Sequence, residues 1–162
     1  LAFDELLRVQ TVLVTRKRAL ERESKGIRHA IDGELVPRLR AALPYELTGA
    51  QQRVIAEIEA DLAGVHPMHR LLQGDVGAGK TLVAVSAMLT AVQGGHQAAL
   101  MAPTEVLAEQ HHTGIRRLVE TLIVPDASTL MGERPVRVEL LTNRTTQAER
   151  KRLAKIRKQI RD

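Results

Sequence analysis

The chain has 162 residues, of which 44% are hydrophobic and 1% aromatic, and its formal net charge is +5. Because it has no cysteine, disulfide frameworks, thiolate metal sites and cysteine nucleophiles are excluded, and such a chain fits a reducing cytosol. No apolar stretch approaches the ~20 residues of a membrane helix and no signal peptide is recognisable, so we expect a cytoplasmic protein with no membrane partner.

The first part of the chain is predicted to contain helices joined by a connector that glycine and proline interrupt. Apolar residues at helical spacing predict a helix from the first residues to about Ser24. Residues 25–46 are interpreted as a connector with a short helix at 35–42. A further helix is predicted from Thr48 to a stop near Gly64, and its buried stripe consists of Val54, Ile55, Ile58 and Leu62.

Strand and helix patterns alternate in the rest of the chain. Short apolar runs predict strands at 69–73, 97–102 and 136–141. The predicted helices cover 82–92, 105–122 and 147–160, and residues 125–135 are interpreted as a loop. This order indicates an α/β fold in which helices flank a parallel sheet.

A phosphate-binding P-loop lies between the first predicted strand and the helix that follows it. Its residues fit the pattern G-x-x-x-x-G-K-T and are Gly74, Asp75, Val76, Gly77, Ala78, Gly79, Lys80 and Thr81. The glycines let the backbone curl so that N–H groups converge on a phosphate at the helix N-terminus. Lys80 is predicted to reach the β- and γ-phosphates and the Thr81 hydroxyl to bind Mg²⁺, so these two are the predicted catalytic residues. ATP with Mg²⁺ is the predicted cofactor.

Three other features permit more than one interpretation. Gln51 can recognise the edge of adenine, or it can close a helix capping box with Thr48. Thr104 follows the second predicted strand, where it can contact a nucleic-acid backbone or cap the next helix. His111 and His112 point in different directions on a helix, so we predict no metal site there.

The acidic residue that a P-loop enzyme needs is not evident. Such an enzyme uses a carboxylate after an apolar strand to hold Mg²⁺ and to orient water. Asp126 is the only candidate, and Pro125 makes the preceding run a poor central strand. We therefore expect this chain by itself to dock a nucleotide without hydrolysing it.

Three stretches, 43–51, 67–81 and 102–111, resemble motifs of the bacterial RecG family of superfamily 2 ATP-dependent DNA helicases. They correspond to its glutamine-type motif, motif I and motif Ia, and 140–142 looks like its next motif. The resemblance covers roughly residues 43–158. It implies a RecA-like motor that moves on branched duplex DNA, reversing forks and migrating Holliday junctions in recombination and repair.

The resemblance also implies a domain organisation and further site residues. Residues 1–43 are expected to be the helical linker from a DNA-wedging domain, and 44–162 the first part of the motor. Because the chain lacks an initial Met and the acidic box, we expect a piece of a longer protein whose missing C-terminal sequence completes the motor. By resemblance, Gln51 contacts adenine, and the residues expected at DNA are Thr104, Gln110 and Thr142.

Three alternative functions stay open. They are the translocase module of a transcription-repair coupling factor, a nucleotide- or DNA-binding module without catalysis, and a small P-loop kinase. Ala78 and Glu105 favour the RecG family over the first, which usually has Tyr and Thr at these positions. The kinase is disfavoured because no lid or acceptor site is recognisable.

Overall fold

The computed structural model describes residues 2–23, 26–126 and 129–159. Its elements are α1 (Ala2–Glu23), α2 (Leu35–Ala42), α3 (Gly49–Leu62), α4 (Lys80–Gln93), α5 (Glu105–Leu118), β1 (Ile123–Pro125), β2 (Glu133–Pro135) and α6 (Gln147–Gln159). The predicted helices are confirmed with small shifts at their ends. The largest shift is in α5, which ends four residues before the predicted 122 because the chain turns there into β1.

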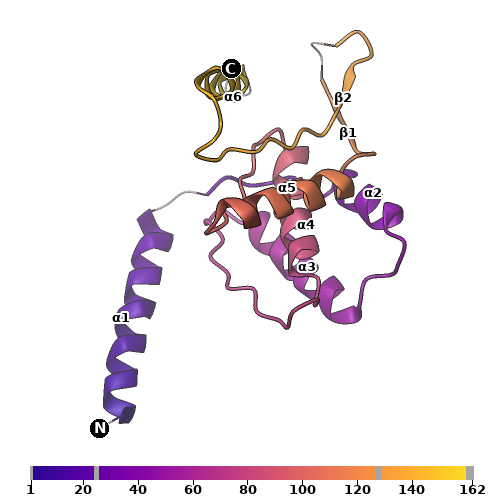
Figure 1. The fold of residues 1–162 in the computed structure, drawn as a ribbon. Coiled ribbons are helices and arrows are strands. Elements are labelled where there is room, and N and C mark those ends of the chain that lie inside the picture. The colour runs from indigo at the N-terminus through magenta and orange to yellow at the C-terminus, as the bar shows by residue number, and fades with distance from the viewer. Residues whose placement is uncertain (1, 24–25, 127–128, 160–162) are drawn as a thin grey trace.

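α4 lies at the centre of the packing, between α2 and α3 (Figure 1). One buried cluster joins α2 to α4, where Leu39 and Val85 are each 1% exposed, and it continues to Ile115 of α5. A second cluster joins α3 to α4 through Ile55, Ile58 and Val83. Burial of each large aliphatic side chain contributes about 1.5–3 kcal/mol, so these two contacts set the position of the helix that follows the P-loop.

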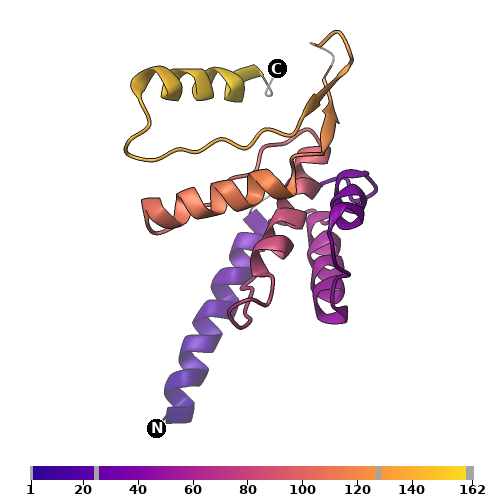
Figure 2. The same ribbon diagram turned by 45° about the vertical axis from the view of Figure 1, so that its right-hand side comes forward.

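α1 extends away from the other helices, with its N-terminus at the far end of the molecule (Figures 1 and 2). Its predicted apolar stripe is exposed: Phe3 is 73% and Leu6 65% accessible. After α1, the Gly26 N–H donates to the Val65 carbonyl, and the Gln93 side-chain amide donates to the Ala30 carbonyl. The segment between α1 and α2 is therefore bound to the C-terminal ends of α3 and α4. None of the described helices has the length and apolar character needed to span a membrane.

The predicted parallel sheet and its three predicted strands are absent from the described residues. Segments 69–73, 97–102 and 136–141 have no regular strand structure, and no backbone hydrogen bond joins any one of these three segments to another. Parallel strands are stable when both neighbours and covering helices are present. Leu71 and Met101 are instead 91% and 93% exposed, so these two side chains lack that cover.

A hairpin forms where a loop was predicted, over residues 125–135. β1 and β2 pair antiparallel, with Val124 opposite Arg134. The connecting turn is held by a 2.8 Å hydrogen bond from the Asp126 N–H to the Gly132 carbonyl and by a 2.8 Å ion pair between Asp126 and Arg134. The only acidic candidate for the nucleotide site is thus occupied within a hairpin turn.

A candidate nucleotide-binding loop and the polar turn beyond it

The P-loop leads directly into α4, as its mechanism requires. Gly77 and Gly79 have φ values of +84° and +79°, which L side chains rarely adopt. Gly79 also faces Gln51 closely, because a Cβ added at Gly79 would lie 2.4 Å from the Gln51 Nε2. Position 79 therefore favours glycine because of its backbone conformation, and a larger residue would also displace the end of the Gln51 side chain.

Lys80 points back over the loop. Its Nζ donates to the carbonyls of Gly74 and Asp75, each at 2.8 Å. Among the described residues, the Ala78 N–H is the only one from residues 74–79 that donates to another group, the Asp75 carbonyl. The remaining N–H groups of the loop and the Lys80 ammonium are thus available to an anion. Thr81 lies beside them, half-buried in the first turn of α4.

Gln51 forms a capping box with Thr48, which is one of the two roles predicted for it. The Thr48 side chain accepts from the Gln51 N–H, and the Gln51 Oε1 accepts from the Thr48 N–H at 2.9 Å. In addition, its Nε2 donates to the Ala78 carbonyl at 3.0 Å. The capping prediction is confirmed, and the amide also joins α3 to the P-loop. The adenine contact stays a prediction, and the link to Ala78 puts the amide beside the loop.

Replacing Gln51 with alanine is expected to weaken ATP binding more than GTP binding. The substitution removes the capping partner, the support of the Ala78 carbonyl and the predicted adenine contact together. Thr48→Ala is the matched control, because it removes the cap at a typical cost of about 1 kcal/mol and leaves the amide in place. Titration of the chain with fluorescent ATP and GTP analogues measures both affinities. Equal losses for the two nucleotides would leave Gln51 with its capping and loop-supporting roles alone.

Two of the three predicted nucleic-acid residues lie at the start of α5, and the third lies further along that helix. Thr104 caps α5, because its hydroxyl accepts from the Leu107 N–H at 3.3 Å, so the capping interpretation is confirmed. Thr142 is brought to the same end of α5 through Glu105, whose carboxylate accepts from the Asn143 N–H at 3.1 Å. Gln110 is exposed further along α5. Contact with nucleic acid stays a prediction for all three.

The turn at 142–145 is tightly bonded. The Arg150 guanidinium donates to the carbonyls of Thr142 and Thr145, and the Arg144 N–H donates to the Thr142 hydroxyl. Arg144 also lies 3.4 Å from the Glu105 carboxylate. Two stretches 38 residues apart are therefore joined at one end of α5, which no local sequence signal had indicated.

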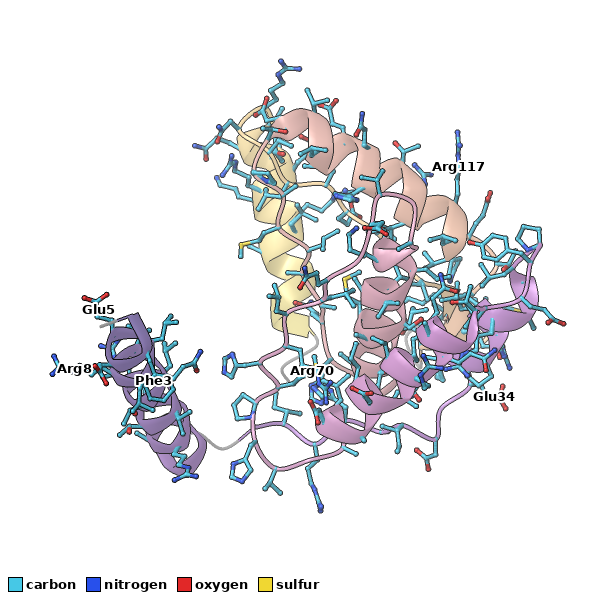
Figure 3. All side chains as sticks on the ribbon, turned by 90° about the horizontal axis from the view of Figure 1, so that it is seen from below. Phe3, Glu5, Arg8, Glu34, Arg70 and Arg117 are labelled. Atoms are coloured by element: carbon cyan, nitrogen blue, oxygen red, sulfur yellow. The ribbon has the colours of Figure 1, made fainter. Side chains whose placement is uncertain are left out.

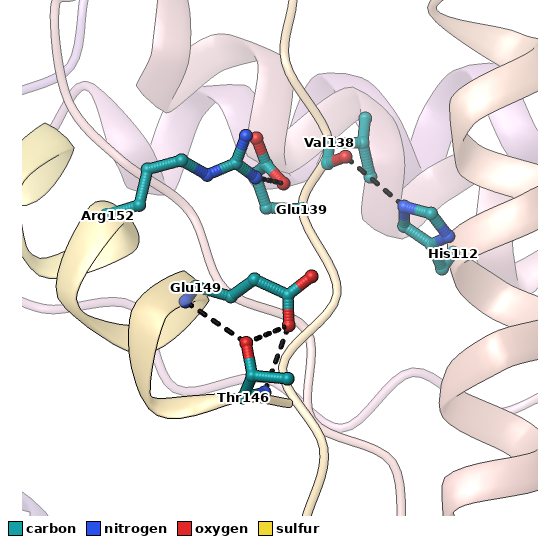
Figure 4. A network of polar contacts seen from close by, with 6 residues as sticks. All are labelled: His112, Val138, Glu139, Thr146, Glu149 and Arg152. Atoms are coloured by element: carbon teal, nitrogen blue, oxygen red, sulfur yellow. Dashed lines mark hydrogen bonds and ion pairs between the residues drawn. The ribbon is translucent and has the colours of Figure 1, made fainter. Parts of the chain in front are cut away.

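α6 begins at a capping box and is tied to the segment before it (Figure 4). The Glu149 carboxylate accepts from the Thr146 hydroxyl and N–H, and the Glu149 N–H donates to the Thr146 hydroxyl. The hydrogen bond from the Thr146 side chain is the main cause of the lowered pKa of Glu149, and the one from the Thr146 N–H is the second. Arg152 pairs with Glu139 at 3.1 Å, and the His112 ring contacts the Val138 carbonyl at 3.2 Å. His112 thus has a structural partner on the neighbouring segment.

Comparison with known proteins places these features in a family context. The model of the family described as DEAD/DEAH box helicase matches residues 48–160. The ATP-dependent DNA helicase RecG of Synechocystis sp. is 44% identical over 153 residues, which is 94% of this chain and 17% of that protein. RecG of Bacillus subtilis is 43% identical over 142 residues, covering 86% of this chain and 20% of that protein.

A solved structure of RecG bound to a three-way DNA junction is similar in fold. The match has a TM-score of 0.76 and 37% sequence identity, and it covers 93% of this chain and 19% of that one. The chain spans about a fifth or less of the length of these relatives.

Proposed function

Because this chain belongs to the DEAD/DEAH box helicase family, we propose that residues 44–162 are the first part of a RecA-like motor domain that binds ATP with Mg²⁺. Residues 1–43 are then the helical linker from a preceding domain. The observation that carries the proposal is the position of Lys80, whose Nζ lies at the start of the loop and donates to the Gly74 and Asp75 carbonyls. Phosphate oxygens that accept hydrogen bonds from the loop N–H groups would lie close to this ammonium and would be attracted by its charge.

Mg²⁺ would be held by the Thr81 hydroxyl together with phosphate oxygens of the nucleotide. Thr81 fits this role because it is in the first turn of α4 and its hydroxyl has no hydrogen bond among the described residues. Bound there, Mg²⁺ would neutralise part of the negative charge of the phosphates. Asp126 is committed to Arg134, so the residues of this chain hold the nucleotide, and we expect no hydrolysis from them alone.

We further propose that the whole protein is a RecG-type helicase that acts on branched duplex DNA, in the cytoplasm of a bacterium. The support is the 37–44% identity to RecG proteins and a structural relative solved with a three-way junction. The turn at 142–145 and the start of α5, which carry Thr142 and Thr104, form the surface we assign to DNA. Arg144 and Arg150 bring two positive charges to this surface against the single negative charge of Glu105, and a net positive charge favours phosphate.

The same proposal accounts for the exposed apolar segments. In a protein of the relatives' length, residues 69–73 and 97–102 would be strands of one parallel sheet, with Leu71 and Met101 covered. Residues 98–102, Ala-Ala-Leu-Met-Ala, have the apolar composition typical of a strand buried on both faces. Uncovered apolar residues such as Leu71 and Met101 promote association.

The test uses a protein of the relatives' length beside the 162-residue chain. Fork DNA is expected to stimulate ATP hydrolysis by the long protein more strongly than linear duplex of the same base composition, because the proposed substrate is a branch point. The chain alone is expected to bind ATP with Mg²⁺ and to show no turnover. Equal stimulation by fork and linear DNA would contradict the branched-DNA assignment, and turnover by the chain alone would contradict the proposed division of the site.

A further inference from the structure

Arg70, four residues before the P-loop, forms a double ion pair with α3. Its Nε donates to the Asp61 Oδ2 at 2.5 Å and one terminal nitrogen donates to the Glu57 Oε2 at 2.7 Å. These bonds, first the one to Asp61, raise the pKa of the Arg70 guanidinium. Glu57 and Asp61 are four residues apart on one helix, so they face the same side and are matched to the planar fork of an arginine. Arg70 is labelled in Figure 3.

Apolar contacts on both sides of Arg70 reinforce this attachment. Met68 and Leu72 pack against the cluster that contains Ile55 and Ile58 of α3, whereas Leu71 is 91% exposed. The side chains at 68, 70 and 72 therefore turn toward α3, with the period-2 alternation of a strand. The segment that leads into the P-loop is thus attached along α3 by two apolar contacts and one ionic contact.

α3 also contacts the far side of the loop. Its first turn carries Gln51, whose Nε2 donates to the Ala78 carbonyl, while its last turns carry Glu57 and Asp61. Residues 51 and 61 are separated by about 15 Å along the helix at 1.5 Å per residue. A single rigid helix therefore holds the loop at Ala78 and the segment that enters the loop at Arg70, one contact on either side of Gly74.

We infer that Arg70 is a positioning residue of the nucleotide site, which fixes the entry to the P-loop on α3 so that Gln51 and the loop keep one geometry. This inference rests on the proposed function. The hydrogen bonds of the Arg70 side chain go to Asp61 and Glu57 of α3, so its effect on the loop is exerted through α3. The orientation of the loop N–H groups determines how well they fit phosphate, so small displacements of the loop reduce affinity.

The exposure of the ion pairs separates this role from global stability. The side chains of Arg70, Glu57 and Asp61 are 37%, 58% and 39% exposed. Ion pairs this exposed contribute little to unfolding free energy, because water screens them. A large loss of nucleotide affinity in an Arg70 variant with an unchanged melting temperature would therefore report on positioning.

The test compares Arg70→Gln with the matched control Arg38→Gln in the intact chain. Arg38 of α2 also forms an exposed ion pair, with Glu34 just before the helix, so its replacement removes the same charge and the same kind of contact away from the loop. Arg70→Gln is expected to weaken binding of a fluorescent ATP analogue with Mg²⁺ by roughly three- to thirtyfold. Arg38→Gln is expected to change it less than about twofold. Arg70→Lys keeps the positive charge but lacks the planar guanidinium, so its loss of affinity is expected to lie between those of Arg70→Gln and Arg38→Gln.

Hydrogen exchange provides a second readout that needs no nucleotide. Arg70→Gln is expected to accelerate exchange of the amides at 49–52 and 76–82, and Arg38→Gln to leave them unchanged. Unchanged exchange and affinity in Arg70→Gln would overturn the inference, as would the same loss in Arg38→Gln. Failure of the wild-type chain to bind nucleotide would contradict the proposed function. The hydrogen-exchange result would then decide by itself whether Arg70 positions the loop.

Discussion

Lys80→Ala is expected to eliminate measurable binding of ATP with Mg²⁺ while the helices remain folded. A hydrogen bond from an ammonium to a charged phosphate oxygen is worth about 1.5–3 kcal/mol. The substitution also removes the two bonds that Lys80 makes to the Gly74 and Asp75 carbonyls of the loop, so affinity is expected to fall by roughly 100-fold or more. Lys80 is half-buried at the start of α4 and belongs to neither apolar cluster. Its removal therefore deletes the charge at the phosphate site and leaves the packing of α4 in place.

The control for Lys80 is Lys151→Ala on the exposed face of α6, which lowers the net charge by the same amount elsewhere. Titration with a fluorescent ATP analogue gives the affinity, and circular dichroism gives the helix content. We expect wild-type affinity for Lys151→Ala and wild-type helix content for both variants. Retained nucleotide binding by a folded Lys80→Ala chain would remove the P-loop assignment on which the proposed function depends.

The features that local sequence predicts best are those decided by neighbouring residues. The capping box at Thr48 and Gln51 involves residues three apart, and the structure confirms it. The same holds for the start of α5 at Thr104 and for the beginning of α4 immediately after the loop. The P-loop glycines are also local, because the positive φ at Gly77 and Gly79 is a property of the loop itself.

Features that depend on distant residues could not be predicted in this way. A strand forms only if partners lie beside it, so the apolar pattern at 69–73 predicted a sheet that the described residues do not build. The hairpin over 123–135 was missed because its prolines disfavour a central strand, although Pro125 and Pro135 fit the ends of a two-stranded ribbon. The Gln51 bond to Ala78 spans 27 residues, and no pattern within a helix indicates it.

The second large effect is expected from Leu39→Ala in α2. Leu39 is 1% exposed and belongs to the cluster that attaches α2 to Val85 and Leu89 of α4. Removing a fully buried leucine side chain costs about 2–5 kcal/mol, since the loss of transfer energy adds to the cost of the cavity. Against a total stability of about 5–15 kcal/mol, this is a large fraction. Chemical denaturation followed by circular dichroism measures the change.

Leu71→Ala makes the same chemical change at a site that is 91% exposed. In this chain it is expected to alter the unfolding free energy by less than about 0.5 kcal/mol. A loss similar to that of Leu39→Ala would show that Leu71 is covered in solution and would contradict the structure. In a protein of the relatives' length the proposed sheet covers Leu71, so the same substitution should then cost several-fold more. The substitution is the same in both proteins, so a larger loss of stability in the longer one must come from the residues that cover Leu71 there. The comparison therefore tests whether residues 69–73 form a strand only when neighbouring strands are present.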